Sequence, residues 1–480
     1  MSWVLALALC ATVPALAQGR RNADPSTVKL RDQAGELATK VKSSFTVAAV
    51  GDIIQMQPFS KMNDPAVQKL VKILREADLT VANMESLIVD FDSYTGFKSA
   101  NLATKEVADD LAAMGIKMVT KANNHTFDGG EAGLWENFRQ LERVGIIHVG
   151  AGRTMTEARM PRYYQTGKGL AGMVGIYGDA APAGPGGSPS AASYWVDGFG
   201  GKVGNNALRL TTYNGVTAEQ FAQLKAMRDS INARRSEVAE PTELAPDEPG
   251  VLEVFDTRFK VTPKPGEFSY EMNRADEQDI MRNIKTGKQF SDFMLATIHW
   301  HQNRFAFQHY SFDNYPADYE IKFAHEAIDH GADVFVGHGV HTIKGVEIYK
   351  GKPIFYGLSN YVFQMQIMPI GSANPTRDPG AGEMNELRWA WLQKPANLQA
   401  LLATSRYENG QLAEVRIYPV DLGQTFRPGS QIGIPKAPSP EVARKILEEV
   451  QTYSKPFGTV IAIENDVGVI RIESGAAARK

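Results

Sequence analysis

Short apolar runs alternate with amphipathic stretches along most of the chain. Residues 45–50 (FTVAAV) form a continuous apolar run, and residues 65–76 repeat apolar side chains at the 3.6-residue period of a helix. The same order of strand and helix returns through residues 79–177 and again through residues 276–336. This alternation predicts an α/β fold with a largely parallel core sheet. We expect further strands at 79–82, 117–120, 146–149, 172–177, 293–298, 333–336 and 467–472, and further helices at 105–114, 131–144, 276–286, 317–330 and 440–453.

Two kinds of segment, hairpins and loop-rich stretches, depart from this alternation. Residues 346–355 and 401–420 have hairpin patterns around Lys350-Gly351 and Asn409-Gly410. Residues 179–204 are rich in Gly, Pro, Ser and Ala, and residues 228–249 are charged and contain proline. We therefore predict a loop-rich insertion at about residues 179–270, placed on the surface of the core.

The first residues have the pattern of an export signal. Residues 2–17 are uncharged and mostly apolar, and they end in Ala15-Leu16-Ala17, a typical cleavage pattern, before Gln18. The run is short for a membrane span, although an uncleaved anchor is the alternative interpretation. We predict cleavage and a periplasmic or extracellular mature protein without a transmembrane segment. The only cysteine, Cys10, lies in this run, so the mature chain would have no disulfide and no cysteine nucleophile.

The remaining residues divide into three predicted parts. Residues 18–44 are polar and form an N-terminal arm, and residues 45–425 form the core domain with its insertion. Residues 426–480 form a C-terminal helix and strand packed on the core. Composition is that of a soluble globular protein, with 43% hydrophobic residues and a net charge of -3. The absence of a basic stripe argues against a nucleic-acid partner.

Candidate chemistry gathers where predicted strands end. Five of the nine histidines lie in three motifs of this kind, and an acidic motif follows the first strand. Neutral imidazoles and carboxylates delivered from successive strand ends are the donors that a divalent metal centre requires. The four motifs are Gly51-Asp52, Asn123-Asn124-His125, His299-Trp300-His301 and Gly337-His338-Gly339-Val340-His341.

Each acidic or amide residue in these positions has a functional and a structural interpretation. Asp52 is either a metal ligand or a turn residue that caps the next segment. Asn83 and Glu85 follow the second strand and point the same way by the period of two. Glu85 is either a carboxylate that bridges two metal ions or a polar strand exit.

The histidine motifs carry the stronger signal. The amide oxygen of Asn124 can bind a metal while His125 acts as a general acid or electrostatic stabiliser, with Asp128 orienting it. The alternative is a polar loop with a satisfied histidine. His299 and His301 share a strand face, whereas His338 and His341 lie in a loop whose glycines allow close backbone approach.

Taken in order, these motifs resemble the CapA family of poly-gamma-glutamate capsule biosynthesis proteins, which has a calcineurin-like metallophosphoesterase fold. The resemblance covers roughly residues 45–420 and includes Gly331-Ala332-Asp333, Gly351-Lys352-Pro353 and Asn360-Tyr361. It implies a layered α/β sandwich and His125 as the catalytic histidine. The metal ligands that it implies are Asp52, Glu85, Asn124, His299, His338 and His341.

The chain departs from the family pattern at several positions. The Asp-x-His of metallophosphoesterases reads Asp52-Ile53-Ile54, and the Gly that follows His-Trp in the family is His301. At these positions we predict that His301 and Asn303 contact the substrate, together with Trp300 and Asn360. Arg209 is a further candidate for contact with an anionic substrate.

The expected function is that of an exported metal-dependent hydrolase or transferase with one or two Mn, Zn or Fe ions. The resemblance implies poly-gamma-glutamate or a related capsule or cell-envelope substrate. One alternative is an enzyme for a small aromatic or phosphorylated molecule, in a pocket walled by Tyr194, Trp195 and Phe199. Another is a non-catalytic capsule-assembly factor that binds a polyanion.

Overall fold

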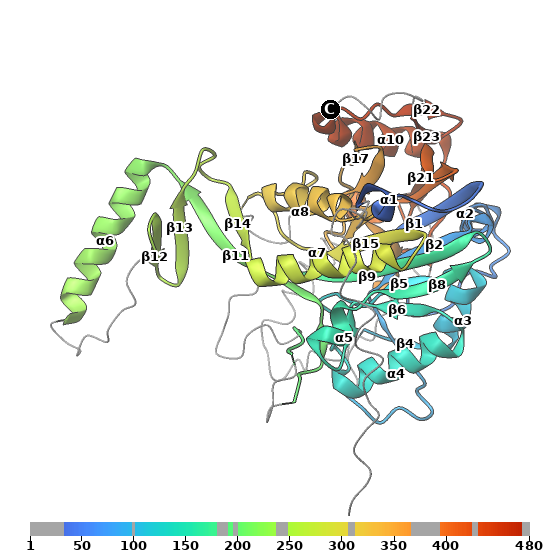
Figure 1. Ribbon diagram of the computed structural model, residues 1–480, viewed down its shortest axis with the longest axis horizontal. Coiled ribbons are helices and arrows are strands. Elements are labelled where there is room, and N and C mark those ends of the chain that lie inside the picture. The colour runs from blue at the N-terminus through green and yellow to red at the C-terminus, as the bar shows by residue number, and fades with distance from the viewer. Residues whose placement is uncertain are drawn as a thin grey trace, which may run out of the picture.

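The computed structural model describes most of the chain in a body built around two β-sheets, with an arm standing out from one side (Figure 1). The described residues are 33–97, 101–179, 191–194, 200–236, 248–305, 313–365, 394–424 and 431–472. The predicted signal peptide, Trp195 and Phe199 lie outside these residues.

The first sheet combines parallel strands from the N-terminal half with antiparallel strands from the C-terminal part. It has nine strands among the described residues, and β19 pairs beside β1. Strands β1, β2, β5 and β6 run parallel, and the hairpin β20–β21 joins the opposite edge of β1. The strands are β1 Ser44–Ile54, β2 Leu79–Met84, β5 Met118–Thr120, β6 Ile147–Val149, β19 Asn360–Phe363, β20 Gln399–Glu408, β21 Gln411–Asp421, β22 Ala462–Glu464 and β23 Val467–Arg471.

The second sheet extends from the body into the arm. Its centre is parallel, in the order β11-β9-β15-β16-β18, and β17 closes one edge as the hairpin partner of β18. The strands are β8 Arg162–Thr166, β9 Gly169–Asp179, β11 Ala207–Val216, β12 Val251–Val254, β13 Thr257–Val261, β14 Phe268–Met272, β15 Phe293–His299, β16 Val334–His338, β17 Val346–Tyr349 and β18 Lys352–Phe355. Two short pairs lie outside both sheets: β3 Leu87–Val89 with β4 Leu102–Thr104, and β7 Ala151–Gly152 with β10 Gly204–Asn205.

The two sheets pack face to face, and helices cover their outer faces. Val47 and Ala49 of β1 share one apolar cluster with Leu295 of β15, whereas Ala48 and Val50 join a separate cluster with helices α2 and α3. This alternation follows from the period of two along a strand. Helices α7 and α8 cover the other sheet. The helices are α1 Gln33–Leu37, α2 Pro65–Glu76, α3 Glu106–Ala113, α4 Gly130–Arg143, α5 Met155–Arg159, α6 Ala218–Ser236, α7 Arg274–Gln289, α8 Asp318–Asp329 and α10 Pro440–Ser454.

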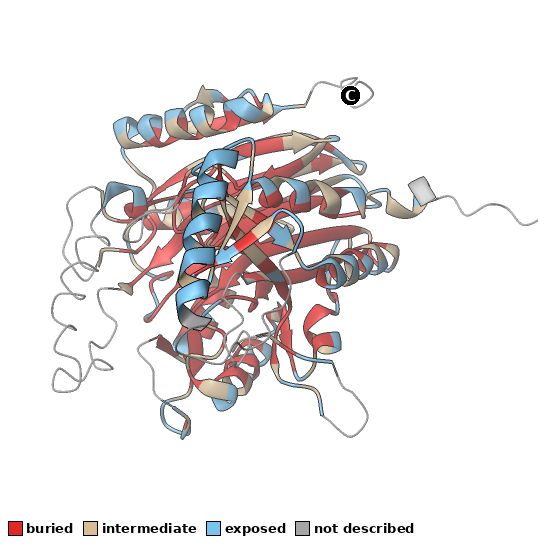
Figure 2. Ribbon diagram, turned by 90° about the vertical axis from the view of Figure 1, so that its left-hand side faces the viewer, coloured by how far each residue is buried: buried red, intermediate tan, exposed pale blue. Residues whose placement is uncertain are grey.

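The body is therefore a four-layer α/β/β/α sandwich, and the predicted layered α/β fold is confirmed. Figure 2 shows buried strands in the interior and exposed surfaces on the outer helices. Both predicted hairpins form, with Lys350-Gly351 and Asn409-Gly410 at positive φ as two-residue turns of this kind require. Among the described residues, no helix is both long and apolar enough to cross a membrane.

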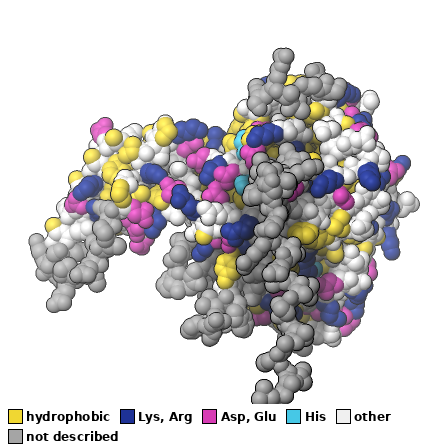
Figure 3. All heavy atoms as spheres, in the orientation of Figure 1, with side chains coloured by type: hydrophobic (Ala, Val, Ile, Leu, Met, Phe, Trp, Pro, Cys, Tyr) yellow, Lys and Arg dark blue, Asp and Glu magenta, His cyan; other side chains and the backbone are white. Residues whose placement is uncertain are grey.

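The insertion contains more regular structure than its composition predicts. Strand β11 leaves the body and is joined in the arm by β12, β13 and β14, with α6 lying against β12 and β13 (Figure 1). Residues 218–234 of helix α6 include no fully buried side chain. The sequence therefore has no apolar stripe at helical spacing that would predict this helix. On the face shown in Figure 3, charges of both signs are mixed over the arm.

Candidate metal centre

Strand register brings the predicted site residues to one place. Asp52 in β1 pairs with Asn83 in β2 on one side and with Asn360 in β19 on the other. In the second sheet, His299 and His338 are direct register partners at the ends of β15 and β16. The carboxyl ends of parallel strands from both sheets therefore supply one site.

A β-bulge in β1 turns Asp52 toward the second sheet. The register of β1 against β2 shifts between Ala49 and Asp52. Val50 and Ile53 consequently both lie in the helix-side core, although regular alternation over three residues would place them on opposite faces. The extra residue points Asp52 between the sheets, where His299 and His338 lie.

Two glycines permit the close backbone approaches of this region. A Cβ atom on Gly51 would lie 1.8 Å from the carbonyl oxygen of Ser359, so any side chain there would displace the strand. Gly339 has a φ of +98°, and a Cβ atom there would lie 2.7 Å from the carbonyl oxygen of Trp300. The Gly339 N–H donates to Oδ2 of Asp52 at 2.9 Å.

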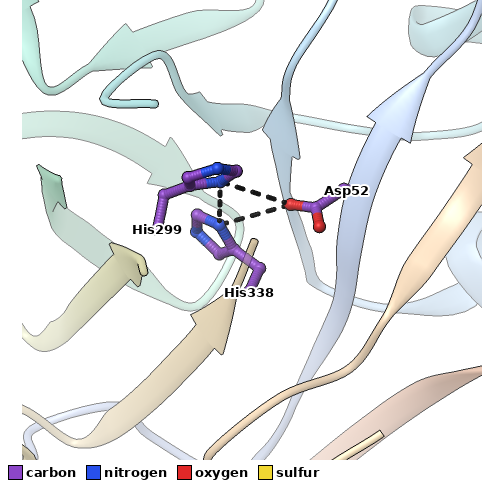
Figure 4. A group of neighbouring side chains, drawn as sticks. All are labelled: Asp52, His299 and His338. Carbon is purple, nitrogen blue, oxygen red and sulfur yellow. Dashed lines mark hydrogen bonds and ion pairs between the residues drawn. The ribbon is translucent and has the colours of Figure 1, made fainter. Parts of the chain in front are cut away.

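Asp52, His299 and His338 form the first group of candidate ligands (Figure 4). Oδ1 of Asp52 lies 3.5 Å from Nδ1 of His299 and 3.4 Å from Nδ1 of His338. The two Nδ1 atoms lie 3.1 Å apart. Donor atoms around one tetrahedral ion are separated by roughly 3.3–3.8 Å, so these spacings need little change to hold an ion.

Asp52, Glu85 and His341 form the second group. His341 Nδ1 lies 3.6 Å from Oδ2 of Asp52, and His341 Nε2 lies 4.0 Å from Oε1 of Glu85. His341 has a φ of +54°, a strained conformation for a residue with a side chain, and Oδ1 of Asn360 lies 2.7 Å from its Nδ1. Asp52 belongs to both groups, so it is the residue placed to bridge two ions.

Burial leaves several polar atoms of this centre without partners. Both carboxylate oxygens of Glu85 and Nε2 of His299 are buried and have no hydrogen-bond partner among the described residues. Such atoms are costly unless something satisfies them. A divalent ion bound by the Glu85 carboxylate would satisfy its oxygens, so the second group fits a metal, whereas the His299 atom that faces Asp52 is Nδ1 and not the unpartnered Nε2.

The protonation states also suit a metal. Burial lowers the pKa of His299 to about 3, against the opposing effect of Asp52, and burial also lowers the pKa of His341. These imidazoles are therefore neutral at neutral pH. Burial alone would raise the pKa of Asp52, but hydrogen bonds with His299 and His338 outweigh it and hold that pKa well below its usual range. Burial and the nearby charge of Asp52 raise the pKa of Glu85 well above its usual range.

His125 lies at the more open side of the second group. Its Nδ1 is 2.6 Å from Oδ2 of Asp128, and its Nε2 is 3.6 Å from Oε1 of Glu85. The side chains of His125 and Asp128 are 35% and 26% exposed, whereas those of Asp52 and Glu85 are fully buried. A carboxylate on Nδ1 fixes the ring and leaves Nε2 facing the metal ligands and solvent.

Two buried amides that sequence reasoning did not assign connect Asp52 to His125. Nδ2 of Asn83 donates to Oδ1 of Asp52 at 2.8 Å, and Nδ2 of Asn123 donates to Oδ1 of Asn83 at 3.0 Å. The His125 backbone N–H donates to Oδ1 of Asn123, and the carbonyl oxygen of Met84 accepts from its Nδ2. A backbone N–H only donates and a carbonyl only accepts, so both amide orientations are fixed. Asn83 therefore presents hydrogens to the centre, not a lone pair for a metal.

The structure does not bring every predicted residue to the centre. Asn124 is exposed, and the buried amide of this motif is that of Asn123. Trp300 is fully buried, because alternation along the strand places it against Tyr319 and Phe335 in the core beneath the helices. Asn360 is also fully buried, and its Oδ1 contacts Nδ1 of His341 at 2.7 Å, beside the second group.

The other predicted substrate contacts have different surroundings. The His301 ring centroid lies 4.7 Å from that of His299 and 5.7 Å from that of His341, so it adjoins both groups. The side-chain oxygen of Asn303 accepts from the backbone N–H of Asp313. Arg209 is paired with the buried carboxylate of Asp276, Nε to Oδ2 2.6 Å. The Tyr194 hydroxyl contacts the side chains of Arg159 and Asp279.

Fold and site together define a layered α/β protein with a candidate divalent-metal centre at its strand ends. The chain belongs to the family described as "Bacterial capsule synthesis protein PGA_cap", whose pattern matches residues 46–365. The predicted family resemblance is confirmed.

The relatives include proteins of known and unknown role. The uncharacterized protein y4sH of Sinorhizobium fredii (strain NBRC 101917 / NGR234) is 34% identical over 92% of this chain and 96% of its own length. The PGA biosynthesis protein CapA of Bacillus subtilis (strain 168) is 23% identical over 66% of this chain and 63% of its own length. A Staphylococcus aureus crystal structure, described as "Putative 5'-Nucleotidase" in complex with alpha-ketoglutarate, aligns with 85% of this chain and 58% of its own, at 10% identity and a TM-score of 0.38.

Proposed function

We propose that this protein is a metal-dependent hydrolase or transferase whose centre holds two divalent ions that share Asp52. The observation that carries the proposal is the fully buried Glu85 carboxylate, which has no hydrogen-bond partner among the described residues, beside histidines that burial keeps neutral. Such ions would polarise a substrate carbonyl or phosphoryl oxygen and lower the pKa of a nearby water.

The residues of the centre would have two roles, metal binding and proton transfer. Asp52, His299 and His338 would hold the first ion, and Asp52, Glu85 and His341 the second. His125, fixed by Asp128 through Nδ1, would donate a proton from Nε2 to the leaving group. Because His125 and Asp128 are the exposed members, substrate would approach from the side of the second group.

For the substrate, we propose poly-gamma-glutamate or a related capsule or cell-envelope polymer. The support is family membership and the name of the Bacillus subtilis relative, a PGA biosynthesis protein. Export of the chain after cleavage near Gln18 is part of this proposal, since capsule polymers lie outside the cell. Intact-mass measurement of native protein tests it, and retention of Met1 would contradict it.

Metal analysis tests the function directly. Protein purified without a histidine tag should contain about two transition-metal ions per chain, and chelation should lower its melting temperature because the ions bind only the folded state. Return of Mn²⁺ or Zn²⁺ should restore stability and hydrolysis of the polymer. Absence of stoichiometric metal, with no stabilisation by either ion, would overturn the proposal. Metal-loaded protein that binds the polymer without cleaving it would favour the capsule-assembly factor instead.

A further inference from the structure

Lys121 is a fully buried lysine directly behind the second group. Its Nζ donates to three consecutive backbone carbonyls, those of Met84 at 2.9 Å, Glu85 at 3.1 Å and Ser86 at 2.9 Å. Three acceptors match the three hydrogens of an ammonium group, so this arrangement favours the charged form of the lysine. An ammonium without solvent is expensive in a protein interior and requires compensation.

The compensation comes from the turn that carries Glu85. The three carbonyls belong to the exit from β2. The N–H groups of Glu85 and Ser86 both donate to the carbonyl oxygen of Ile53 in β1, and the amides of Asn123 and Asn101 donate to the carbonyls of Met84 and Glu85. Lys121 is the residue that joins all three carbonyls. Glu85 and Asp128 act on Lys121 as the opposing negative charges that favour its charged form, although burial lowers its pKa to about 7.

The Glu85 side chain has no hydrogen bond of its own to fix its position. Both of its carboxylate oxygens lack a partner among the described residues, so its direction is set by the backbone beneath it. We propose that Lys121 is a positioning residue that holds the turn at residues 84–86 in place and thereby directs Glu85 toward the second ion. This inference rests on the proposed metal-dependent function.

A matched pair of substitutions tests it. Lys121→Met removes the ammonium and keeps the apolar stem. Lys288→Met is the control, because Lys288 is also fully buried but pairs with Asp333 at the opposite ends of β15 and β16 from the ligands. Mn²⁺ binding to each metal-free protein is measured by calorimetry and by the spin-coupled electron paramagnetic resonance signal of paired ions.

We expect Lys121→Met to lower the affinity for the second Mn²⁺ ion by about 10–100-fold, the usual loss for a residue that orients a ligand. The spin-coupled signal of paired ions should fall with it. The first ion should keep its affinity within about threefold, and Lys288→Met should change neither ion although it lowers the melting temperature. If Lys121→Met does not fold, Lys121→Gln, which keeps two donors, is measured in its place with a smaller loss in the same direction expected.

The outcomes separate this inference from the proposed function. If the unmodified protein binds no Mn²⁺, the proposed function fails and this inference fails with it. If it binds two ions and the Lys121 variant binds both with unchanged affinity, only the positioning role is overturned. Equal loss of both ions from a folded Lys121 variant would also overturn it, because the effect would not be specific to Glu85.

Discussion

The two candidate ligand groups share Asp52 but differ in how complete they are without a metal. In the first group, Nδ1 of His299 and Nδ1 of His338 lie within 3.5 Å of the same carboxylate oxygen, which also accepts from Asn83. In the second group, the Glu85 carboxylate has no hydrogen-bond partner among the described residues. Hydrogen bonds therefore preorganise the first group, whereas the second contains a buried acid whose ionised form is unfavourable until an ion stabilises it.

The largest expected effect is that of Asp52→Asn, because the change affects both groups. The amide would lose the bridging charge, and its NH₂ would face either the Gly339 N–H or the Asn83 amide hydrogens. We expect loss of both ions, loss of measurable turnover, and destabilisation of the metal-free protein by about 1–3 kcal/mol. Metal analysis and denaturant unfolding measure these changes, and retention of either ion would contradict the shared role.

His125→Ala separates chemistry from metal binding at the more exposed side of the centre. Turnover should fall by about 10²–10⁴-fold, the usual contribution of a general acid. Metal content should stay unchanged because His125 belongs to neither group. His330→Ala, outside the centre at the end of α8, is the control. Normal turnover in the His125 variant would exclude the catalytic assignment.

Glu85→Gln sharpens the contrast between the groups. One ion should be lost and one kept. The pKa of Glu85 is raised in the folded state. Above about pH 4.3, the metal-free folded protein therefore binds more protons than the unfolded chain. Its stability falls as the pH rises from that value through the raised pKa. The Gln variant should lack this loss and melt higher than the wild type at neutral pH without metal. A melting temperature below that of the wild type across this pH range would show that ionised Glu85 does not destabilise the metal-free protein.

His301→Gly should have the smallest effect. Its ring adjoins His299 and His341 but is not a member of either group. We expect metal content to stay unchanged and kcat/KM to shift by about tenfold between polymer substrates, the scale of a changed pocket contact. Loss of metal would instead make His301 a ligand.

Much of the framework was predictable from local pattern. Helix α2 occupies the predicted residues 65–76, and the turns at Lys350-Gly351 and Asn409-Gly410 follow from residue chemistry that a hairpin requires. Helix α6 was missed because a helix that buries no side chain fully leaves no apolar stripe to detect. In that case tertiary placement beside β12 and β13, and not periodicity, explains the element.

The site was predictable as a set of strand ends but not as a set of contacts. The motifs indicated Asp52, His299 and His338, yet nothing local distinguishes Asn123 from Asn124, of which the first is buried and the second exposed. The bulge at Gly51-Asp52 and the three carbonyls around Lys121 depend on neighbours remote in the chain. The alternation of side chains along a regular strand predicts which side of the sheet each one faces. It does not predict where pairing with a neighbouring strand introduces a bulge and reverses that alternation.

The pairing of β1 with β19 and β20 has a consequence for the order in which the molecule matures. Asp52 lies beside Asn360, and residues 44–50 pair with residues 402–408. Closing contacts between such distant residues is slow, and the sheet around Asp52 cannot be completed before the last of these strands has been synthesised. A chain ending before residue 399 would contain every candidate ligand and two partners of β1, β2 and β19, but would lack its third partner, β20. We therefore expect ion capture to follow completion of the chain, so that a protein exported unfolded would acquire its ions at its destination.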